Sequence, residues 1–248
     1  MKNKIILDLC GGTGAWSRFY KEAGYDVRVI TLPKYDVRKT KITEDELIFR
    51  KDTNDNYRMR VKKNDVYGIL SAPPCTMFSL ARTKAKKPRD LKEGMEIVRA
   101  CLDIIWRCME IKQDTRKKTL PLKFWALENP NGMLKYFLGK PAFEFDPWQF
   151  SDEYKKKTYL WGWFNEPKKK YHKIEEVMTK EQIEKFKTNN QKLPLFNPYK
   201  SLNPRLQKKF DKLASREIAP EMFGKLTRQE RRAITPVGFA KAFFEVNQ

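Results

Sequence analysis

The 248-residue chain holds 52 Lys and Arg against 31 Asp and Glu, which gives a formal net charge of +21. With 40% hydrophobic and 13% aromatic residues it has the composition of a folded chain rather than a disordered one, and no apolar run approaches the roughly 20 residues that cross a bilayer. We therefore expect an intracellular, cytoplasmic protein without a membrane partner, and the charge favours nucleic acid over other anionic surfaces.

The first third of the chain predicts a strand, a turn, a helix and a second strand. Residues 4–10 form an apolar run that ends in the turn "GGTG", residues 15–23 have helical spacing, and "YDVRVITLP" at 25–33 reads as the second strand. Within "LIFRKDTNDNYRMRV", residues 47–61, we expect a hairpin whose turn is formed by Asp55 and Asn56.

The middle of the chain continues the alternation of strands and helices. We expect a strand at 65–72, a basic loop at 82–92, and a helix at 93–111 with Cys101 and Cys108 on its core face. A strand at 122–130, a short helix at 132–139 and a strand at 155–164 follow. This alternation indicates an α/β fold with a largely parallel sheet.

The composition changes after about residue 165. Residues 166–232 are rich in lysine and asparagine and are interrupted by prolines, whereas 235–248, "TPVGFAKAFFEVNQ", predicts an amphipathic helix that packs against the sheet. The expected organisation is a main α/β domain of residues 1–165 plus 233–248, with 166–232 as a small basic insertion.

The cysteines and the single histidine exclude several kinds of site. Cys10, Cys75, Cys101 and Cys108 form no Cys-x-x-Cys pair, so we expect no metal site. Any histidine-dependent mechanism would rest on His172, which lies in a lysine-rich, surface-like stretch. The thiols are expected to stay reduced.

The turn "DLCGGTGAWS", residues 8–17, places small residues where a backbone must approach a ligand. The dinucleotide fingerprint fails, because Ser17 stands where its third glycine or alanine is required. The order Asp-x-x-x-Gly-x-Gly suits a nucleoside cofactor such as S-adenosylmethionine better, and a simple tight turn is the alternative.

Two further turns carry chemically useful side chains. Cys75 follows the rigid Pro-Pro corner of "APPC", where it is either a buried core thiol or an exposed nucleophile. Glu128 directly follows the apolar residues "FWAL", where it is either held by backbone amides or poised with an altered pKa. In a parallel sheet, ligands bind at the carboxyl ends of the strands, so these turns and the glycine turn should meet at one edge.

Together these features resemble the cytosine carbon-5 DNA methyltransferases, especially the compact group of bacteriophages and prophages. The resemblance covers most of the chain: "DLCGGTGAWS", "YDVR" at 35–38, "GILSAPPCTMFS", "ALENP", "KKTYLWGWF" and "ITPVGFAKAFF". It implies a Rossmann-like S-adenosylmethionine-dependent methyltransferase sheet, with 166–232 as a small target-recognition insertion. It also implies a monomer that acts on double-stranded DNA in a bacterial or phage-infected cell.

For catalysis, the resemblance implies that the Cys75 thiolate adds to carbon 6 of a cytosine that has left the helix. Glu128 would hold the N3 and amino groups of that base, while carbon 5 takes the methyl group. The rigid corner would align the sulfur in advance.

The resemblance also assigns binding roles. Cofactor contacts would come from the glycine turn and two further positions: Asp8, Leu9, Cys10, Gly11, Gly12, Thr13, Gly14, Trp16, Ser17, Asp36 and Pro73. Substrate and DNA contacts would come from the other turns, the basic loop and the last strand: Pro74, Ser79, Arg82, Lys84, Lys86, Lys87, Asn129, Pro130, Lys156 and Lys157.

Three features depart from the family pattern. The acid that should end the second strand is replaced by Thr31 or Leu32. The Gln-x-Arg-x-Arg element is reduced to "KKKTYLW", in which Lys156 and Lys157 supply a basic pair. The insertion 166–232 is short, so it should read few bases.

Other functions fit the same residues. A tRNA cytosine carbon-5 methyltransferase would use identical chemistry, a catalytically silent DNA-binding protein would keep only the fold, and a modified donor would deliver another one-carbon group. The residues indicate neither the target sequence nor whether the protein protects phage DNA or belongs to a restriction-modification pair.

Overall fold

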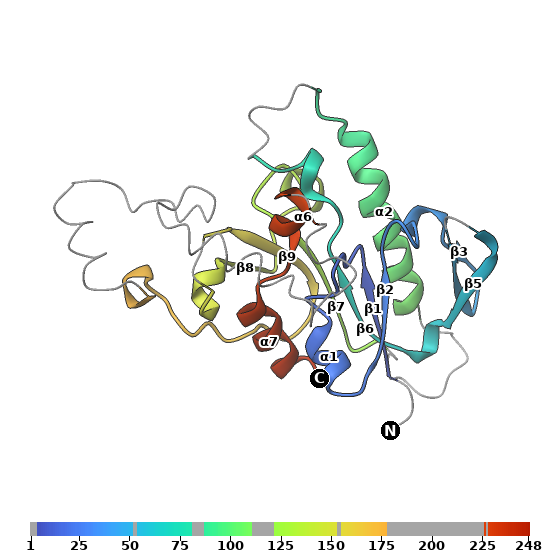
Figure 1. The fold of residues 1–248 in the computed structure, drawn as a ribbon, viewed down its shortest axis with the longest axis horizontal. Coiled ribbons are helices and arrows are strands. Elements are labelled where there is room, and N and C mark those ends of the chain that lie inside the picture. Colours follow the sequence, from blue (N-terminus) through green and yellow to red (C-terminus); the bar gives the residue numbers. More distant parts are fainter. Residues whose placement is uncertain are drawn as a thin grey trace.

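A six-stranded mixed sheet forms the centre of the computed structural model, which describes residues 4–51, 54–80, 87–110, 122–152, 155–177, 226 and 228–248 (Figure 1). The strand order is β2-β1-β6-β7-β9-β8. The bounds are β1 (Ile5–Leu9), β2 (Asp26–Ile30), β6 (Val66–Ser71), β7 (Phe124–Pro130), β8 (Phe143–Phe145) and β9 (Thr158–Trp163).

The first four strands in this order run parallel, as the alternating sequence predicts. β9 pairs antiparallel to β7, and β8 pairs antiparallel to β9, so the sheet is mixed at that end. The fold class is therefore α/β and Rossmann-like, and the expectation of a largely parallel sheet holds for β2, β1, β6 and β7 only. The last two strands follow one another along the chain without a long helical crossover, which is why they pair antiparallel.

Four of the five α-helices in the described residues agree in position with the expected ones, whereas α6 was not predicted. The five are α1 (Arg18–Glu22), α2 (Leu91–Met109), α3 (Lys135–Leu138), α6 (Arg228–Ala233) and α7 (Val237–Val246). Short 3-10 helices lie between them: η1 (Val37–Lys39), η2 (Lys63–Asp65), η3 (Cys75–Met77), η4 (Pro147–Phe150) and η5 (Ile174–Val177).

Helix α2 covers one face of the sheet. Asp90 caps it by accepting a hydrogen bond from the backbone N–H of Glu93 at 2.8 Å. Its buried stripe, which includes Ile104, Ile105 and the expected core residues Cys101 and Cys108, packs with alternate residues of the strands such as Leu7 and Ile69. The prediction that both cysteines are core residues is confirmed.

Helices α1 and α7 lie side by side on the other face (Figure 1). Phe239 and Phe243 of α7 are fully buried, and they pack with Tyr20 of α1 and Phe124 of β7. The Phe124 ring occupies the space beside Gly68, where a Cβ would lie 2.2 Å from it. The predicted terminal helix thus packs on the sheet as expected.

A second sheet contains the predicted hairpin. Strands β3 (Lys41–Ile42), β4 (Glu46–Lys51) and β5 (Asn54–Lys62) pair antiparallel. The turn prediction is wrong, because Asp55 and Asn56 lie within β5, and the last ladder pair joins Lys51 to Asn54. The buried residues Leu47, Phe49 and Val61 attach this sheet to the core on the α2 side.

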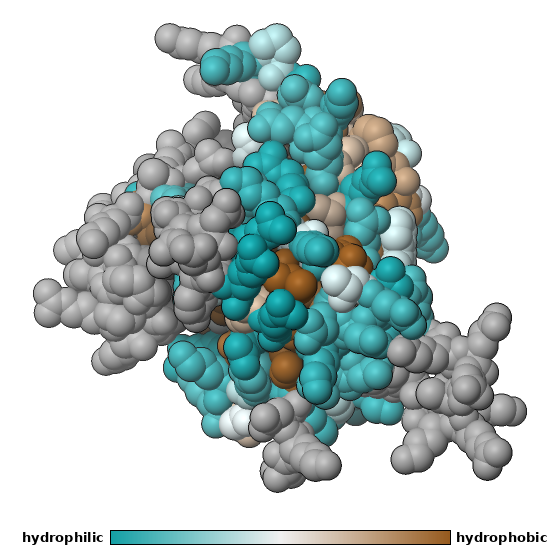
Figure 2. Space-filling model, turned by 90° about the vertical axis from the view of Figure 1, so that its right-hand side faces the viewer, coloured by the Kyte–Doolittle hydropathy of each residue, from teal (hydrophilic) through white to brown (hydrophobic). Residues whose placement is uncertain are grey.

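The side of the molecule that bears α2 and the second sheet is mainly hydrophilic, with small separate hydrophobic areas (Figure 2). In the part of the chain that is described, no helix is both long and apolar enough to cross a membrane. The predicted insertion 166–232 is described only at its two ends, so its proposed boundaries stay a prediction.

Candidate functional site

The three unusual turns meet at the carboxyl edge of the sheet. Leu9 at the end of β1 pairs with Ser71 at the end of β6, and Ser71 pairs in turn with Leu127 of β7. The N–H of Ala72 donates to the Leu9 carbonyl at 2.9 Å, so β1 and β6 end at the same level of the sheet. Since the next residues are the glycine turn, the Pro-Pro corner and Glu128, the register places all three at one edge, as predicted.

A buried hydrogen bond joins the Pro-Pro corner to β7. The side-chain amide of Asn129, which is completely buried, donates to the carbonyl of Pro73 at 2.9 Å. Pro73 is itself buried, whereas Pro74 is exposed. Because the corner has little backbone freedom, this bond fixes the start of η3, where half-buried Cys75 stands.

The segment after Cys75 is also held tightly. The carbonyl of Cys75 accepts from the N–H groups of Phe78 at 2.9 Å and Ser79 at 2.8 Å, and Ser79 forms an isolated bridge with Gly132. A Cβ on Gly132 would lie 2.4 Å from the Phe78 carbonyl oxygen, so only glycine fits there. The thiol is therefore held on a well-supported turn rather than on a loose loop.

Glu128 lies inside β7 (Phe124–Pro130), which agrees with the strand expected at 122–130 and corrects the description of this position as a turn. β7 continues through Pro130 because β9 pairs with it on the other side, with Glu128 opposite Leu160 and Pro130 opposite Thr158. Asn129 and Pro130 are therefore strand residues and do not form a turn. The carboxylate of Glu128 is held at the sheet edge by a regular ladder.

The two lysines before β9 have different partners. Lys156 Nζ lies 3.6 Å from Glu128 Oε1, and both side chains are mostly buried, with 22% and 13% exposed. Lys157 instead pairs with Glu144 of β8, at 2.8 Å between Nζ and Oε2. Only Lys156 of the predicted basic pair therefore lies against a proposed catalytic group.

The ionisable groups around Cys75 show that it shares one environment with Glu128. Burial raises the pKa of the Cys75 thiol, the Lys156 ammonium opposes that rise, and the Glu128 carboxylate adds to it. Arg232 of α6 lowers the pKa of Cys75 as well. The Cys75 thiol in η3 is thus within electrostatic reach of the Glu128 carboxylate and of two cations, although these groups come from segments far apart in the sequence.

Arg232 was not identified from the sequence. The only available signal was the basic run in "RQERRAITP" just before the last helix, which reads as ordinary surface charge. The nearby contact of buried Ile234 with Ala15 brings this segment against the glycine turn.

The glycine turn is built around a buried carboxylate. Asp8 is completely buried and accepts from Ser17 Oγ at 2.5 Å, and its Oδ1 has no hydrogen-bond partner in the part of the chain that the structure describes. Burial raises its pKa to about 6, although the Ser17 hydrogen bonds oppose the rise. A Cβ on Gly11 would lie 2.3 Å from the Asp8 carboxylate, and Gly12 and Gly14 have φ values of +55° and +70°.

Several residues assigned to the cofactor point their side chains into the protein. Leu9 belongs to the core on the α2 side, and Trp16 is 1% exposed and packs against Phe239 and Phe243. Cys10 has φ +56° and its Sγ lies 4.0 Å from Cys101 Sγ. Leu9 and Trp16 therefore have only backbone atoms to offer a cofactor, whereas Cys10 and Thr13 are half-buried and Gly12 is exposed.

Asp36 does not present an open carboxylate. It accepts hydrogen bonds from the backbone N–H of Arg38 at 2.9 Å and from the Arg38 guanidinium at 2.6 Å, and this pairing lowers the pKa of Asp36. Only 8% of Asp36 is exposed. Its proposed contact with adenine would require Arg38 to move, which the sequence could not reveal.

The predicted basic loop is only partly described. Lys87 is exposed, whereas Arg82, Lys84 and Lys86 lie outside the described residues. Within the ranges described, no cluster of three or more His, Cys, Asp or Glu side chains could hold a metal ion.

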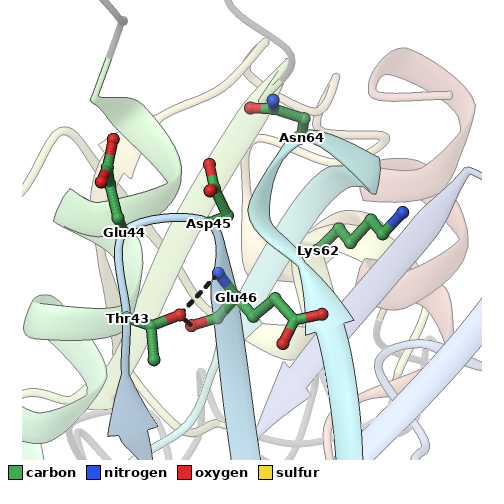
Figure 3. Close-up of a pocket in the computed structure, with 6 residues that line it drawn as sticks. All are labelled: Thr43, Glu44, Asp45, Glu46, Lys62 and Asn64. Atoms are coloured by element: carbon green, nitrogen blue, oxygen red, sulfur yellow. Dashed lines mark hydrogen bonds between the residues drawn. The ribbon is translucent and has the colours of Figure 1, made fainter.

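A pocket of about 550 Å³ lies away from this edge (Figure 3). Thr43, Glu44, Asp45, Glu46, Lys62 and Asn64 line it. Asn64 precedes β6, so the pocket lies at the amino end of that strand, opposite Cys75. Thr43 Oγ1 bonds the backbone of Glu46 at 2.9 and 3.0 Å and closes the β3–β4 turn, which gives this acidic corner a structural explanation.

Comparison with known proteins adds no further identification. No protein-family model matches the chain, and no curated protein matches it significantly.

Proposed function

We propose that the chain is an S-adenosylmethionine-dependent DNA methyltransferase that modifies carbon 5 of cytosine through a covalent cysteine adduct. The supporting observation is the joint placement of Cys75 and Glu128 at the carboxyl edge, with Lys156 3.6 Å from the carboxylate and the glycine turn alongside. The net charge of +21 fits a duplex DNA substrate. Residues 166–232 would form the target-recognition insertion of a monomer.

The glycine turn fits the methionine and ribose end of S-adenosylmethionine. The close approach of Gly11 to Asp8 leaves no Cβ above the carboxylate, and the unpaired Asp8 Oδ1 is a buried acceptor beneath the turn. The backbone of residues 11–14 would hold the cofactor, which supplies an electrophilic methyl group when bound. Asp36, already paired with Arg38, fits the adenine less well.

Cys75 provides the nucleophile. Its Sγ would bond to carbon 6 of the base, and the electron pair of the 5,6 double bond would move toward carbon 5, which makes that carbon nucleophilic. Because burial raises the pKa of Cys75, the resting group is a thiol, so its proton must pass to solvent water before the sulfur attacks. Lys156 and Arg232 stabilise the thiolate that results.

Glu128 supports the same step from the other side of the base. A proton held between its carboxyl group and N3 of cytosine lets the ring accept the electron pair from Cys75. Lys156 holds the carboxylate in one orientation through the 3.6 Å contact. Once carbon 5 carries the methyl group, transfer of its proton to water restores the 5,6 double bond and releases the Cys75 sulfur as a thiolate.

The fixed position of the corner explains why the nucleophile stands there. The Asn129–Pro73 hydrogen bond and the two prolines hold the sulfur before the base arrives. Alignment of reacting groups in advance contributes several kcal/mol to enzyme reactions, up to about 7–11 kcal/mol in well-oriented systems. The target base must leave the duplex to reach this position.

The experiment is transfer of tritium from labelled S-adenosylmethionine to duplex DNA, followed by base analysis. We expect label in cytosine with the unchanged chain and none with Cys75→Ala, whose unfolding curve should match the original. Equal activity of the two proteins would contradict the assignment of the nucleophile. A parallel reaction with tRNA tests the RNA alternative, which predicts label in RNA only.

A catalytically silent DNA-binding protein is the second candidate. It is favoured by the pairing of Asp36 with Arg38 and by the lack of an acid at the end of β2, both of which would weaken cofactor binding. It predicts DNA binding without measurable binding of S-adenosylmethionine, which isothermal titration calorimetry would distinguish.

A further inference from the structure

Exposed apolar side chains gather beside the candidate site. Among the large hydrophobic residues of the described chain, Leu80, Tyr136 and Phe137 are 58%, 76% and 47% exposed. Leu80 follows the segment that begins at Cys75, and the two aromatic residues lie in α3, which follows the strand that carries Glu128. Scattered exposed hydrophobics need no explanation, but these three flank the same edge of the sheet.

Direct contacts tie these two segments together. The N–H of Met133 donates to the Phe78 carbonyl at 2.9 Å, and Ser79 bridges to Gly132. The rings of Phe78 and Phe137 meet edge-to-face with centroids 6.2 Å apart. Helix α3 is therefore tied to the segment that follows Cys75, and the Phe137 ring packs against that segment.

The surroundings of these aromatic residues are basic. Residues 131–142 contain Lys135 and Lys140 and no acidic residue. Lys135 Nζ lies 5.4 Å from the centre of the Tyr136 ring, and exposed Lys87 belongs to the neighbouring basic loop. Aromatic rings interleaved with cations are the combination by which proteins stack on bases and neutralise phosphates.

We propose that Tyr136 and Phe137 form a stacking platform for the DNA bases that flank the extruded cytosine. The proposal rests on the function proposed above. Extrusion of a nucleotide leaves its neighbours unstacked, and the exposed Tyr136 ring offers them a replacement surface beside the Cys75–Glu128 edge. Phe137 is partly fixed by Phe78 and offers a second exposed ring next to Tyr136 in the chain.

The test compares Tyr136→Ala with the unchanged chain in binding to a fluorescent duplex, measured by anisotropy without any methyl donor. We expect binding to weaken about tenfold or more, the size that loss of one base-stacking contact gives. Tyr136→Phe, which keeps the ring, should bind within about twofold of the unchanged chain. Because Tyr136 is 76% exposed, these variants should unfold at the same temperature as the original.

Trp106→Ala is the matched control. Trp106 is 53% exposed and lies near the end of α2. This end of α2 lies at the amino end of β6, because Lys63, just before β6, contacts Glu110, just after α2, at 3.8 Å. Trp106 is therefore at the opposite edge of the sheet from Cys75. We expect no change in DNA binding from this loss of an exposed aromatic ring.

Salt dependence separates stacking from phosphate contact. Tyr136→Ala should leave the slope of log K against log salt unchanged, whereas Lys135→Gln should reduce it by about 0.9 if Lys135 neutralises one phosphate. A lowered slope for Tyr136→Ala, or unchanged binding, would overturn the platform.

The outcomes also separate this inference from the proposed function. Tritium transfer to cytosine with normal DNA binding by Tyr136→Ala refutes the platform and leaves the methyltransferase standing. Weakened binding by Tyr136→Ala without any transfer supports a DNA surface and refutes the enzyme. No binding of duplex DNA by the unchanged chain refutes both.

Discussion

Replacement of Asn129 by leucine tests how the proposed nucleophile is positioned. The side chain of Asn129 is completely buried and donates to the Pro73 carbonyl at 2.9 Å. Leucine keeps the same branched arrangement of side-chain heavy atoms but is larger and has no donor, so it leaves that carbonyl without its bond. The corner before Cys75 then loses its only side-chain tie to β7 among the hydrogen bonds of the described residues.

The magnitude follows from that one bond. An unsatisfied buried carbonyl costs about 1–3 kcal/mol. Because Asn129 Oδ1 has no hydrogen-bond partner among the described residues, its removal offsets part of this cost, so we expect a net loss of about 1–2 kcal/mol. For a chain of this size, that lowers the midpoint of thermal unfolding by roughly 2–8 °C.

Thermal and urea unfolding measure the loss, and tritium transfer measures its effect on activity. We expect transfer by Asn129→Leu to fall by about tenfold or more at saturating substrates, because misalignment of reacting groups acts on the chemical step. Unchanged stability together with unchanged transfer would refute the positioning argument.

Asn129→Asp provides the companion test. A protonated carboxyl group can donate to the Pro73 carbonyl, whereas an ionised one cannot, and burial should favour the protonated form. The stability of Asn129→Asp relative to the original should therefore recover as the pH falls from 7 toward 5. A difference in free energy of unfolding that does not vary with pH would contradict the role of the donor.

Three further changes test the glycine turn and the charges of the site. Burial raises the pKa of Asp8 to about 6, so the native state binds more protons than the unfolded state between about pH 4 and 6, and the Asp8 contribution to stability falls as the pH rises through that window. Asp8→Asn should therefore be more stable than the original by about 3 kcal/mol at pH 7 but not at pH 4. A difference in urea unfolding that does not vary with pH would contradict this. Gly11→Ala places a Cβ 2.3 Å from the Asp8 carboxylate and should cost about 1–3 kcal/mol while weakening S-adenosylmethionine binding, and calorimetry that shows full affinity would oppose a cofactor site there. Lys156→Met removes the largest influence that lowers the pKa of Cys75, so the pH profile of Cys75 alkylation by iodoacetamide, followed by peptide mass spectrometry, should shift to higher pH; an unshifted profile would separate the two groups.

The sequence predicted the main elements and the edge of the site because these depend on local patterns. The apolar run before the glycine turn and the buried stripe of 93–111 match β1 and α2 closely. Glycine and proline punctuation marked the ends of β1 and β6, so the convergence of the turns followed from parallel topology alone.

Other features depend on partners distant in sequence, which single-chain patterns do not identify. Trp16 was assigned to the cofactor because it adjoins the glycine turn, yet Phe239 and Phe243 enclose it. The antiparallel pairing of β7 with β9 also joins segments that are distant in the sequence. Likewise, the pairing of Asp36 with Arg38 and the presence of Arg232 near Cys75 became evident only from the fold.

The most direct test of the proposed chemistry is a covalent trap. Duplex DNA that contains 5-fluorocytosine would be incubated with the protein and S-adenosylmethionine, because fluorine at carbon 5 prevents release of the thiol. We expect a stable protein–DNA adduct whose digestion locates the modified base on the peptide that contains Cys75. Absence of an adduct, or an adduct on Cys10 that persists in Cys75→Ala, would contradict the proposed mechanism.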